Sequence, residues 1–146
     1  MTSHRWSQNI EQTLPSRQGA HVPLIEEILA KLEELGWEFR DRFGIHMALE
    51  ESLTNAIRHG NKFDETKVVK VHYRLSPERF WLMVQDEGPG FVPECVPDCT
   101  CEDRLDVPGG RGLMLIRAYM NEVCYSGTGN CVTMEKIRGQ EPVIDD

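Results

Sequence analysis

The sequence lacks any long hydrophobic run. Its longest apolar stretches span about five residues, as in FWLMV from Phe80, whereas a helix that crosses a bilayer needs about 20. The opening residues MTSHRWSQNI also lack the apolar stretch of a secretory signal. We therefore expect no membrane segment and a cytoplasmic location.

Positive charge is also scarce. The chain carries 24 acidic and 16 basic residues, for a formal net charge of -8, and its basic residues form no stripe. Proteins bind nucleic acids largely by placing basic side chains against the negatively charged phosphates, and this chain has no basic stripe that could do so. The sequence therefore disfavours direct nucleic-acid binding, although local donors could still hold a small anionic ligand.

The cysteines do not form an even set. The chain has five of them, and an odd number without a secretory signal argues against a disulfide framework. Cys95, Cys99 and Cys101 form a C-x3-C-x-C cluster, but this is not a common zinc spacing and no histidine lies nearby, so an ordinary loop is favoured over a metal site. Cys124 and Cys131 are predicted to lie opposite each other across a hairpin as packed thiols rather than as a bridge.

The composition is that of one soluble globular domain. The chain has 146 residues, of which 40% are hydrophobic and 27% are charged, and its mean hydropathy is -0.43. That length buries one core of ordinary size and is too short for two. We expect a single domain over residues 1–146 with one functional site.

Hydrophobic periodicity divides the first half of the chain into a strand and two helices. Weak alternation over residues 6–14 predicts an edge strand that ends at the following proline. Apolar residues at helical spacing predict an amphipathic helix from Pro23 to a stop at Gly36. A second helix is expected over about residues 42–59, with Gly60 in the left-handed conformation that closes it.

The second half is expected to hold two hairpins and a helix. The β-rich runs TKVVKVHYRL and RFWLMVQD predict the first hairpin, and VCYSGTGNCVTMEKI predicts the second, turning near residues 127–129. Between them, residues 87–110 are rich in proline and glycine and predict a long loop. RGLMLIRAYMNEV then predicts a helix with Leu113, Ile116 and Met120 inward. This order of elements indicates an α+β two-layer sandwich.

The second helix has two unlike faces. At about 100° per residue, apolar side chains gather on one side and polar side chains on the other. The apolar set is Leu49, Leu53, Ala56 and Ile57, and the polar set is Glu51, Asn55 and Arg58. A solvated polar face is the simplest interpretation of one such helix, so the stretch ALEESLTNAIRHGN indicates little by itself.

An acidic residue and two glycines follow the central strand. In VQDEGPGF, Asp86 precedes Gly88 and Gly90. A carboxylate at a strand end, beside backbone that can approach a ligand closely, is a suitable acceptor for an exocyclic amine. The alternative is an ordinary acidic turn, because Asp-x-Gly turns are common.

A glycine-rich junction opens the last helix. In GGRGLMLI, the residues Gly109, Gly110 and Gly112 leave backbone N–H groups free at the positive end of the helix dipole, which suits phosphate. Such junctions are weak indicators when they stand alone. The chain contains no Walker loop, so any nucleotide site must be of another kind.

The three motifs together resemble a known constellation. EESLTNAIRHGN, VQDEGPGF and GGRGLMLI are similar, in this order, to the asparagine box and the two glycine boxes of the Bergerat-fold (GHKL) ATPase domains. Within that superfamily the likeness is greatest to the small anti-sigma-factor serine kinases, and it covers about residues 20–137. The resemblance implies a mixed, mostly antiparallel sheet with helices on one face and a lid loop over about residues 91–110.

The resemblance also implies ATP and Mg²⁺ as cofactors and assigns residues to them. Asn55 would offer its side-chain oxygen to Mg²⁺, Asp86 would accept from the adenine amino group, and Glu51 would be the catalytic base. The remaining residues that it places at ATP are Arg58, His59, Gly88, Gly90, Gly110, Arg111, Gly112 and Leu113. Cys131 stands where relatives have a threonine that helps hold adenine, which would weaken nucleotide binding.

Partners follow from the resemblance as well. It implies a homodimer that sequesters a sigma factor and phosphorylates a serine of an antagonist protein, the anti-anti-sigma factor. Two alternatives stay open: a non-catalytic module that binds ATP or ADP and acts on another protein, and a domain that binds no nucleotide. A stand-alone histidine-kinase domain is disfavoured, because such domains typically lack a glutamate at the position of Glu51 and no preceding pair of dimerisation helices occurs here.

Overall fold

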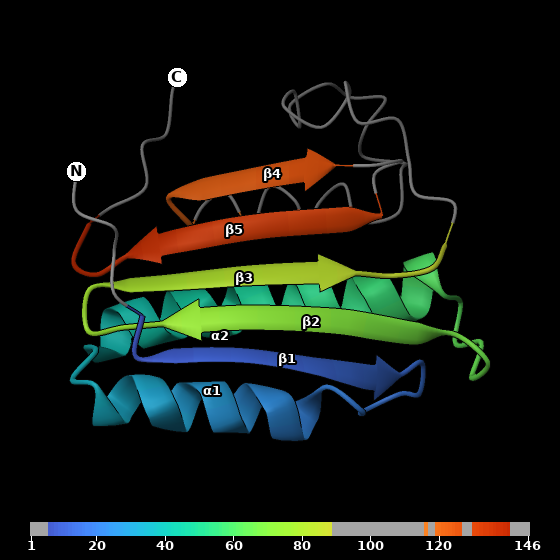
Figure 1. The fold of residues 1–146 in the computed structure, drawn as a ribbon, viewed down its shortest axis with the longest axis horizontal. Helices are drawn as coiled ribbons and strands as arrows, with labels where there is room; N and C mark the ends of the chain where they lie inside the picture. The colour runs from blue at the N-terminus through green and yellow to red at the C-terminus, as the bar shows by residue number, and fades with distance from the viewer. Residues whose placement is uncertain (1–5, 89–115, 117–118, 127–129, 141–146) are drawn as a thin grey trace.

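The structure is a computed structural model that describes residues 6–88, 116, 119–126 and 130–140 (Figure 1). In chain order its elements are β1 (Gln8–Pro15), α1 (Val22–Glu34), α2 (Phe39–Thr54), η1 (Asn55–Gly60), β2 (Val68–Leu75), β3 (Arg79–Gln85), β4 (Glu122–Ser126) and β5 (Cys131–Ile137). Residues 91–110, predicted to form a lid, lie outside the described part of the chain.

The strands form one sheet in the order β1-β2-β3-β5-β4. Every pairing among the described strands is antiparallel. β1 is an edge strand, as predicted, and both predicted hairpins are present as β2–β3 and β4–β5. The predicted α+β class is therefore confirmed.

One face of the sheet carries the core. Side chains alternate along the strands, and the inward set is buried: Val69, Val71, Tyr73 and Leu75 on β2, Phe80, Leu82 and Val84 on β3, and Val132 and Met134 on β5. The helices cover this face, and Figure 1 shows α2 running behind β2 and β3. Alternation with a period of two is what one buried face requires, so the sheet has a covered side and an open side.

Helix α1 follows its apolar pattern closely. Its buried residues are Leu24, Ile25, Ile28 and Leu32, which recur at the spacing of one helical face. Gly36 has φ of 88° and ends the helix as predicted. Ile116 and Met120, which were predicted to face inward, are also buried, whereas Leu113 lies outside the described residues.

A polar network joins α1 to the sheet. The Tyr73 hydroxyl donates to Glu27, and Lys31 Nζ donates to the Tyr73 hydroxyl at 2.8 Å. Burial, and then the hydrogen bond to Glu27, raise the pKa of Tyr73 above its ordinary value, so the phenol remains a proton donor. A fully buried hydroxyl is thereby paired on both sides.

Helix α2 begins earlier and ends differently than predicted. It starts at Phe39, and its α-helical part ends at Thr54 rather than at residue 59. Residues Asn55–Gly60 continue it as the π-helix η1, closed by a bond from the Asn61 N–H to the Ala56 carbonyl at 2.9 Å. Short π segments inside α-helices are rare and are frequent at functional sites.

The predicted left-handed conformation of Gly60 is wrong. Positive φ values occur instead at Lys62 (52°) and Phe63 (59°), beyond the end of η1. Because η1 has wider turns than an α-helix, the chain turns away later than a regular helix would. Gly60 is required for a different reason, which is its contact with Asp86.

The two hairpin cysteines are not opposite each other. Cys124 pairs with Thr133, and Cys131 pairs with Ser126, so the register differs by two residues from the predicted one. Both are free thiols, and Cys124 is exposed rather than packed. None of the described helices is both long and apolar enough to cross a membrane.

A buried ion pair fixes the start of α2 to the end of β5. Lys136 Nζ lies 3.7 Å from Asp41 Oδ1, and the two side chains are only 6% and 9% exposed. The other carboxylate oxygen of Asp41 accepts the Gly139 N–H at 2.8 Å. A buried pair of this kind is costly to break from one side, because the remaining charge then has no partner.

We predict that Asp41→Ala lowers the free energy of unfolding by about 3–5 kcal/mol, since the buried Lys136 ammonium would lose its countercharge and keep only its hydrogen bond to the Gln140 carbonyl. Urea denaturation measures the change. Glu65→Ala is the control, because it breaks a pair with Arg17 in which both side chains are about two-thirds exposed, and such pairs contribute about 0–1 kcal/mol. Equal losses in the two variants would contradict the prediction. Adding Lys136→Met to Asp41→Ala is expected to restore part of the stability.

Candidate functional site

Glu51 and Asn55 share one face of the long helix. Glu51 lies in the last turn of α2, and Asn55 is the first residue of η1, four positions later. Both are partly exposed, whereas Leu49 and Leu53 on the other face are completely buried. The packing therefore leaves a carboxylate and an amide accessible about one turn apart, as the periodicity predicted.

Asp86 lies at the end of the same helix. It follows the last residue of β3 and is half-buried. A Cβ atom added to Gly60 would lie 2.3 Å from Asp86 Cγ and 2.4 Å from Oδ2. The carboxyl group thus occupies the space that a side chain at position 60 would need, and the Asp86 turn is packed directly against the end of η1.

Gly88 completes this contact. Its N–H donates to Asp86 Oδ1 at 2.8 Å, and a Cβ added to Gly88 would lie 2.1 Å from the Gly60 carbonyl oxygen. Gly60 and Gly88 therefore permit two chain segments to meet at van der Waals distance. The sequence predicted closeness to a ligand for Gly88, but it did not predict that Gly88 would contact Gly60.

Hydrogen bonds from the described residues engage one oxygen of the Asp86 carboxylate. Oδ1 accepts from Gly88, and Oδ2 accepts no hydrogen bond from the described residues. Burial raises the pKa of Asp86 above its ordinary value, partly offset by the Gly88 N–H bond and by Lys67. A half-buried carboxylate with an open acceptor position fits a ligand that offers an amino group.

Arg58 and His59 lie in η1 and are exposed. Basic side chains in the last turn of a helix also stabilise its negative end, so their position is compatible with a structural role as well as with the predicted contact to phosphate. Gly90, Gly110, Arg111, Gly112 and Leu113 lie outside the described residues, and their predicted roles remain predictions.

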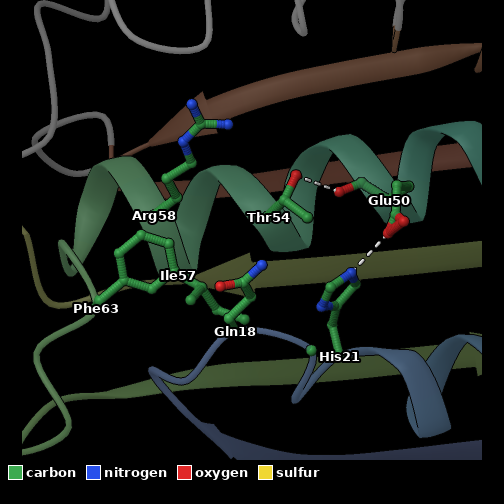
Figure 2. A pocket seen from close by; sticks show the side chains of 8 residues that line it. Gln18, His21, Glu50, Thr54, Ile57, Arg58 and Phe63 are labelled. Carbon is green, nitrogen blue, oxygen red and sulfur yellow. Dashed lines mark hydrogen bonds and ion pairs between the residues drawn. The ribbon is translucent and has the colours of Figure 1, made fainter.

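A separate pocket of about 290 Å³ lies beside α2 and η1, against a face of the helix next to that of Glu51 and Asn55 (Figure 2). Glu50, Thr54 and Arg58 form one wall, and the segment between β1 and α1 forms the other. His21 Nε2 lies 2.6 Å from Glu50 Oε2 across the gap. Neither Asn55 nor Asp86 lines this pocket, so we do not identify it with the site around Asp86.

The described residues do not hold three His, Cys, Asp or Glu side chains placed to bind a metal together. Asn55 offers one amide oxygen on an accessible surface, which suits an ion that takes most of its ligands from phosphates and water. The role predicted for Asn55 at Mg²⁺ stays a prediction. Cys131, which stands where relatives have a threonine that helps hold adenine, is half-buried at the start of β5.

Comparison with known proteins gives a consistent result. Residues 14–136 match the histidine kinase-like ATPase domain. The chain is 28% identical to the serine-protein kinase RsbW of Bacillus licheniformis over 93% of the chain and 89% of that protein. It is 27% identical to RsbW of Bacillus subtilis, over 94% and 90%, and 25% identical to RsbW of Staphylococcus aureus, over 92% and 89%.

A solved structure has the same fold. The crystal structure of the RsbU and RsbW domains of a Mycobacterium tuberculosis protein superposes with a TM-score of 0.62 at 17% identity, covering 95% of this chain. The present chain spans 35% of the length of that structure. At this identity the match shows the fold alone.

We predict that Gly60→Ala displaces the Asp86 carboxyl group and lowers the free energy of unfolding by about 1–3 kcal/mol, since it overfills a closed contact. Gly44→Ala is the control, because a Cβ there meets Tyr119 at 3.2 Å and helix propensity favours alanine. Chemical denaturation compares the two. The double variant Gly60→Ala/Asp86→Ala should recover stability, because the three heavy atoms nearest to the added Cβ all belong to Asp86. Failure of this recovery would show that the overlap is not the cause.

A second prediction concerns pH. The ordinary pKa of an aspartate is 3.8, and in the folded protein the pKa of Asp86 is higher. Between these two values the folded protein keeps a proton on Asp86 that the unfolded chain has lost. The contribution of Asp86 to stability is therefore greatest at low pH and declines as pH rises through this window. Unfolding free energies of wild type and Asp86→Asn, measured across the window, should diverge in favour of Asp86→Asn as pH increases. A constant or opposite difference would contradict the assignment.

Proposed function

The chain belongs to the histidine kinase-like ATPase domain family, and on this basis we propose that it is an ATP-dependent protein serine kinase that acts as an anti-sigma factor. The resemblance predicted from the three motifs is confirmed by the family match and by the RsbW relatives. Those relatives are named serine-protein kinases, which supports the transfer of phosphate to serine as the activity of this chain.

One observation in particular supports the proposal. The helix that carries Glu51 and Asn55 ends at Gly60, and Gly60 is packed against the carboxyl group of Asp86. The carboxylate and the amide of this helix are thereby joined at its end by a second carboxylate from a distant part of the sequence. A nucleotide whose base reaches Asp86 would extend its phosphates along η1 toward Asn55.

Each residue has a role in this proposal. Asp86 accepts a hydrogen bond from the adenine amino group through Oδ2, which accepts none from the described residues, and Asn55 offers its amide oxygen to Mg²⁺. When bound, Mg²⁺ would offset the negative charge of the phosphates. Glu51, one turn before Asn55, is placed to orient a serine hydroxyl and to accept its proton. Burial of the opposite helix face fixes the position of the backbone that bears these groups.

The proposal extends to the location, the assembly and the partners of the protein. We infer that the protein is cytoplasmic, that it acts as a homodimer on a sigma factor, and that its substrate is a serine of an antagonist protein. Residues 1–146 would form one domain with a lid over about residues 91–110. The second candidate function, a regulator that binds ATP or ADP without transferring phosphate, is favoured by the modest identity to the kinases.

The decisive experiment is incubation of the protein with labelled ATP and a candidate antagonist protein. We predict that wild type labels a serine of the antagonist and that Glu51→Gln reduces the rate by about 100-fold or more, because loss of general base catalysis typically costs that much. Mg-ATP binding, followed by the rise in melting temperature, should be preserved in Glu51→Gln.

Glu50→Gln is the matched control. It removes the same charge one residue earlier, at a side chain that contacts His21 and does not share the helix face of Glu51 and Asn55. Equal loss of activity in both variants would remove Glu51 as the base. If wild type binds Mg-ATP and labels no antagonist, the regulatory module is the correct function. If Mg-ATP produces neither heat nor a melting shift, the chain does not use this nucleotide.

A further inference from the structure

We propose that Asn61 and Asn130 are positioning residues that hold the Asp86 turn from two sides and so set the preference for adenine over guanine. The inference rests on the proposed contact between Asp86 and the base. Asn61 is the last residue of the first motif and Asn130 lies outside all three motifs. Neither was assigned a contact with the ligand, and each acts through the backbone around Asp86.

Asn61 is a buried hub. The residue is only 1% exposed, and both polar groups of its side chain are hydrogen-bonded. Oδ1 accepts the Glu87 N–H at 2.7 Å, and Nδ2 donates to Ser16 Oγ at 2.8 Å and to the Val68 carbonyl at 3.1 Å. One side chain therefore joins the residue after Asp86 to the end of β1 and the start of β2.

Ser16 fixes this hub in turn. It is completely buried, and its hydroxyl donates to the Lys67 carbonyl at 2.7 Å while it accepts from Asn61. Buried polar groups that are fully paired make a local structure rigid, because any displacement leaves a group without a partner. The Glu87 peptide is thus held by a network that is anchored in two strands.

Asn130 holds the other side of the turn. Its carbonyl accepts the Asp86 N–H at 2.9 Å. Its side-chain Nδ2 donates to the Asp86 carbonyl at 3.1 Å and reaches the Gly88 carbonyl at 3.5 Å. Together the two asparagines contact the backbone of each residue from Asp86 to Gly88, a segment that lies beyond the last residue of β3.

The consequence is control over where the carboxylate points. Gly60 limits the carboxyl group on one side, and the two asparagines prevent the turn from moving away from Gly60. Adenine presents an amino donor, whereas guanine presents a carbonyl acceptor at the same position. A fixed carboxylate accepts from the first and repels the second, and a turn that can shift loses this discrimination.

The test compares Asn61→Ala and Asn130→Ala with Asn121→Ala. Asn121 is the matched control because its Oδ1 also accepts a backbone N–H at 2.7 Å, from Ile137 at the far end of β5. Calorimetry measures the affinities for Mg-ATP and Mg-GTP, and amide exchange follows the Glu87 N–H. Both test variants should weaken Mg-ATP binding by about tenfold and lower the ratio of ATP to GTP affinity, since each loses bonds worth about that much.

Asn121→Ala should lower the melting temperature to a similar extent and leave both affinities unchanged. In Asn61→Ala the Glu87 N–H should exchange faster, with or without nucleotide. The double variant should lose less affinity than the product of the single losses, because both residues fix the same turn.

Several outcomes would overturn the proposal. It fails if the test variants keep the ATP to GTP ratio of wild type while their melting temperatures fall, since both asparagines would then be merely structural. If Asn61→Ala does not fold, Asn130→Ala decides the case, because Asn130 is only half-buried and its replacement disturbs the core less. If wild type binds no Mg-ATP but the Glu87 exchange responds as expected, the proposed nucleotide function is wrong and the hydrogen-bond arrangement stands without the specificity assigned to it.

Discussion

The contact between Gly60 and Asp86 is the constraint on which the site depends. It leaves no room for a side chain at position 60, since an added Cβ would overlap the Asp86 carboxyl group. Because of it, the helix that carries Glu51 and Asn55 cannot move along its axis without displacing the turn after β3. A tightly packed contact of this kind transmits position from one segment to the other, so the relative placement of the three polar groups is determined by packing.

The same helix serves two surfaces. Its buried face is held to the sheet by Leu49 and Leu53, and its accessible residues divide between the proposed nucleotide face at Asn55 and the pocket beside His21. The π-helical segment η1 lies where these surfaces converge. Its wider turns change the direction in which each residue after Asn55 points relative to a regular helix. In this arrangement Gly60, which has no side chain, faces Asp86.

Most of the fold was predictable from the sequence because it depends on periodicity. Alternation in β2 and β3 and the apolar stripe of α1 each identify one buried face, and both hairpins follow from the turns between strands. The site was predictable only as a set of residues in order. Periodicity placed Asn55 on an exposed face, but the left-handed conformation expected at Gly60 was wrong, since a glycine that closes a helix and a glycine that clears a carboxylate have the same sequence signal.

The sequence by itself determined which residues face the core, where the strands turn, and which motifs identify the family, because each of these depends on neighbours within a few positions. Only the tertiary structure decided that Gly60 meets Asp86, that Cys124 faces Thr133, and that Asn61 and Asn130 hold the same turn. These contacts join residues that are far apart in the chain, and they depend on packing distances and strand register, which local patterns do not encode.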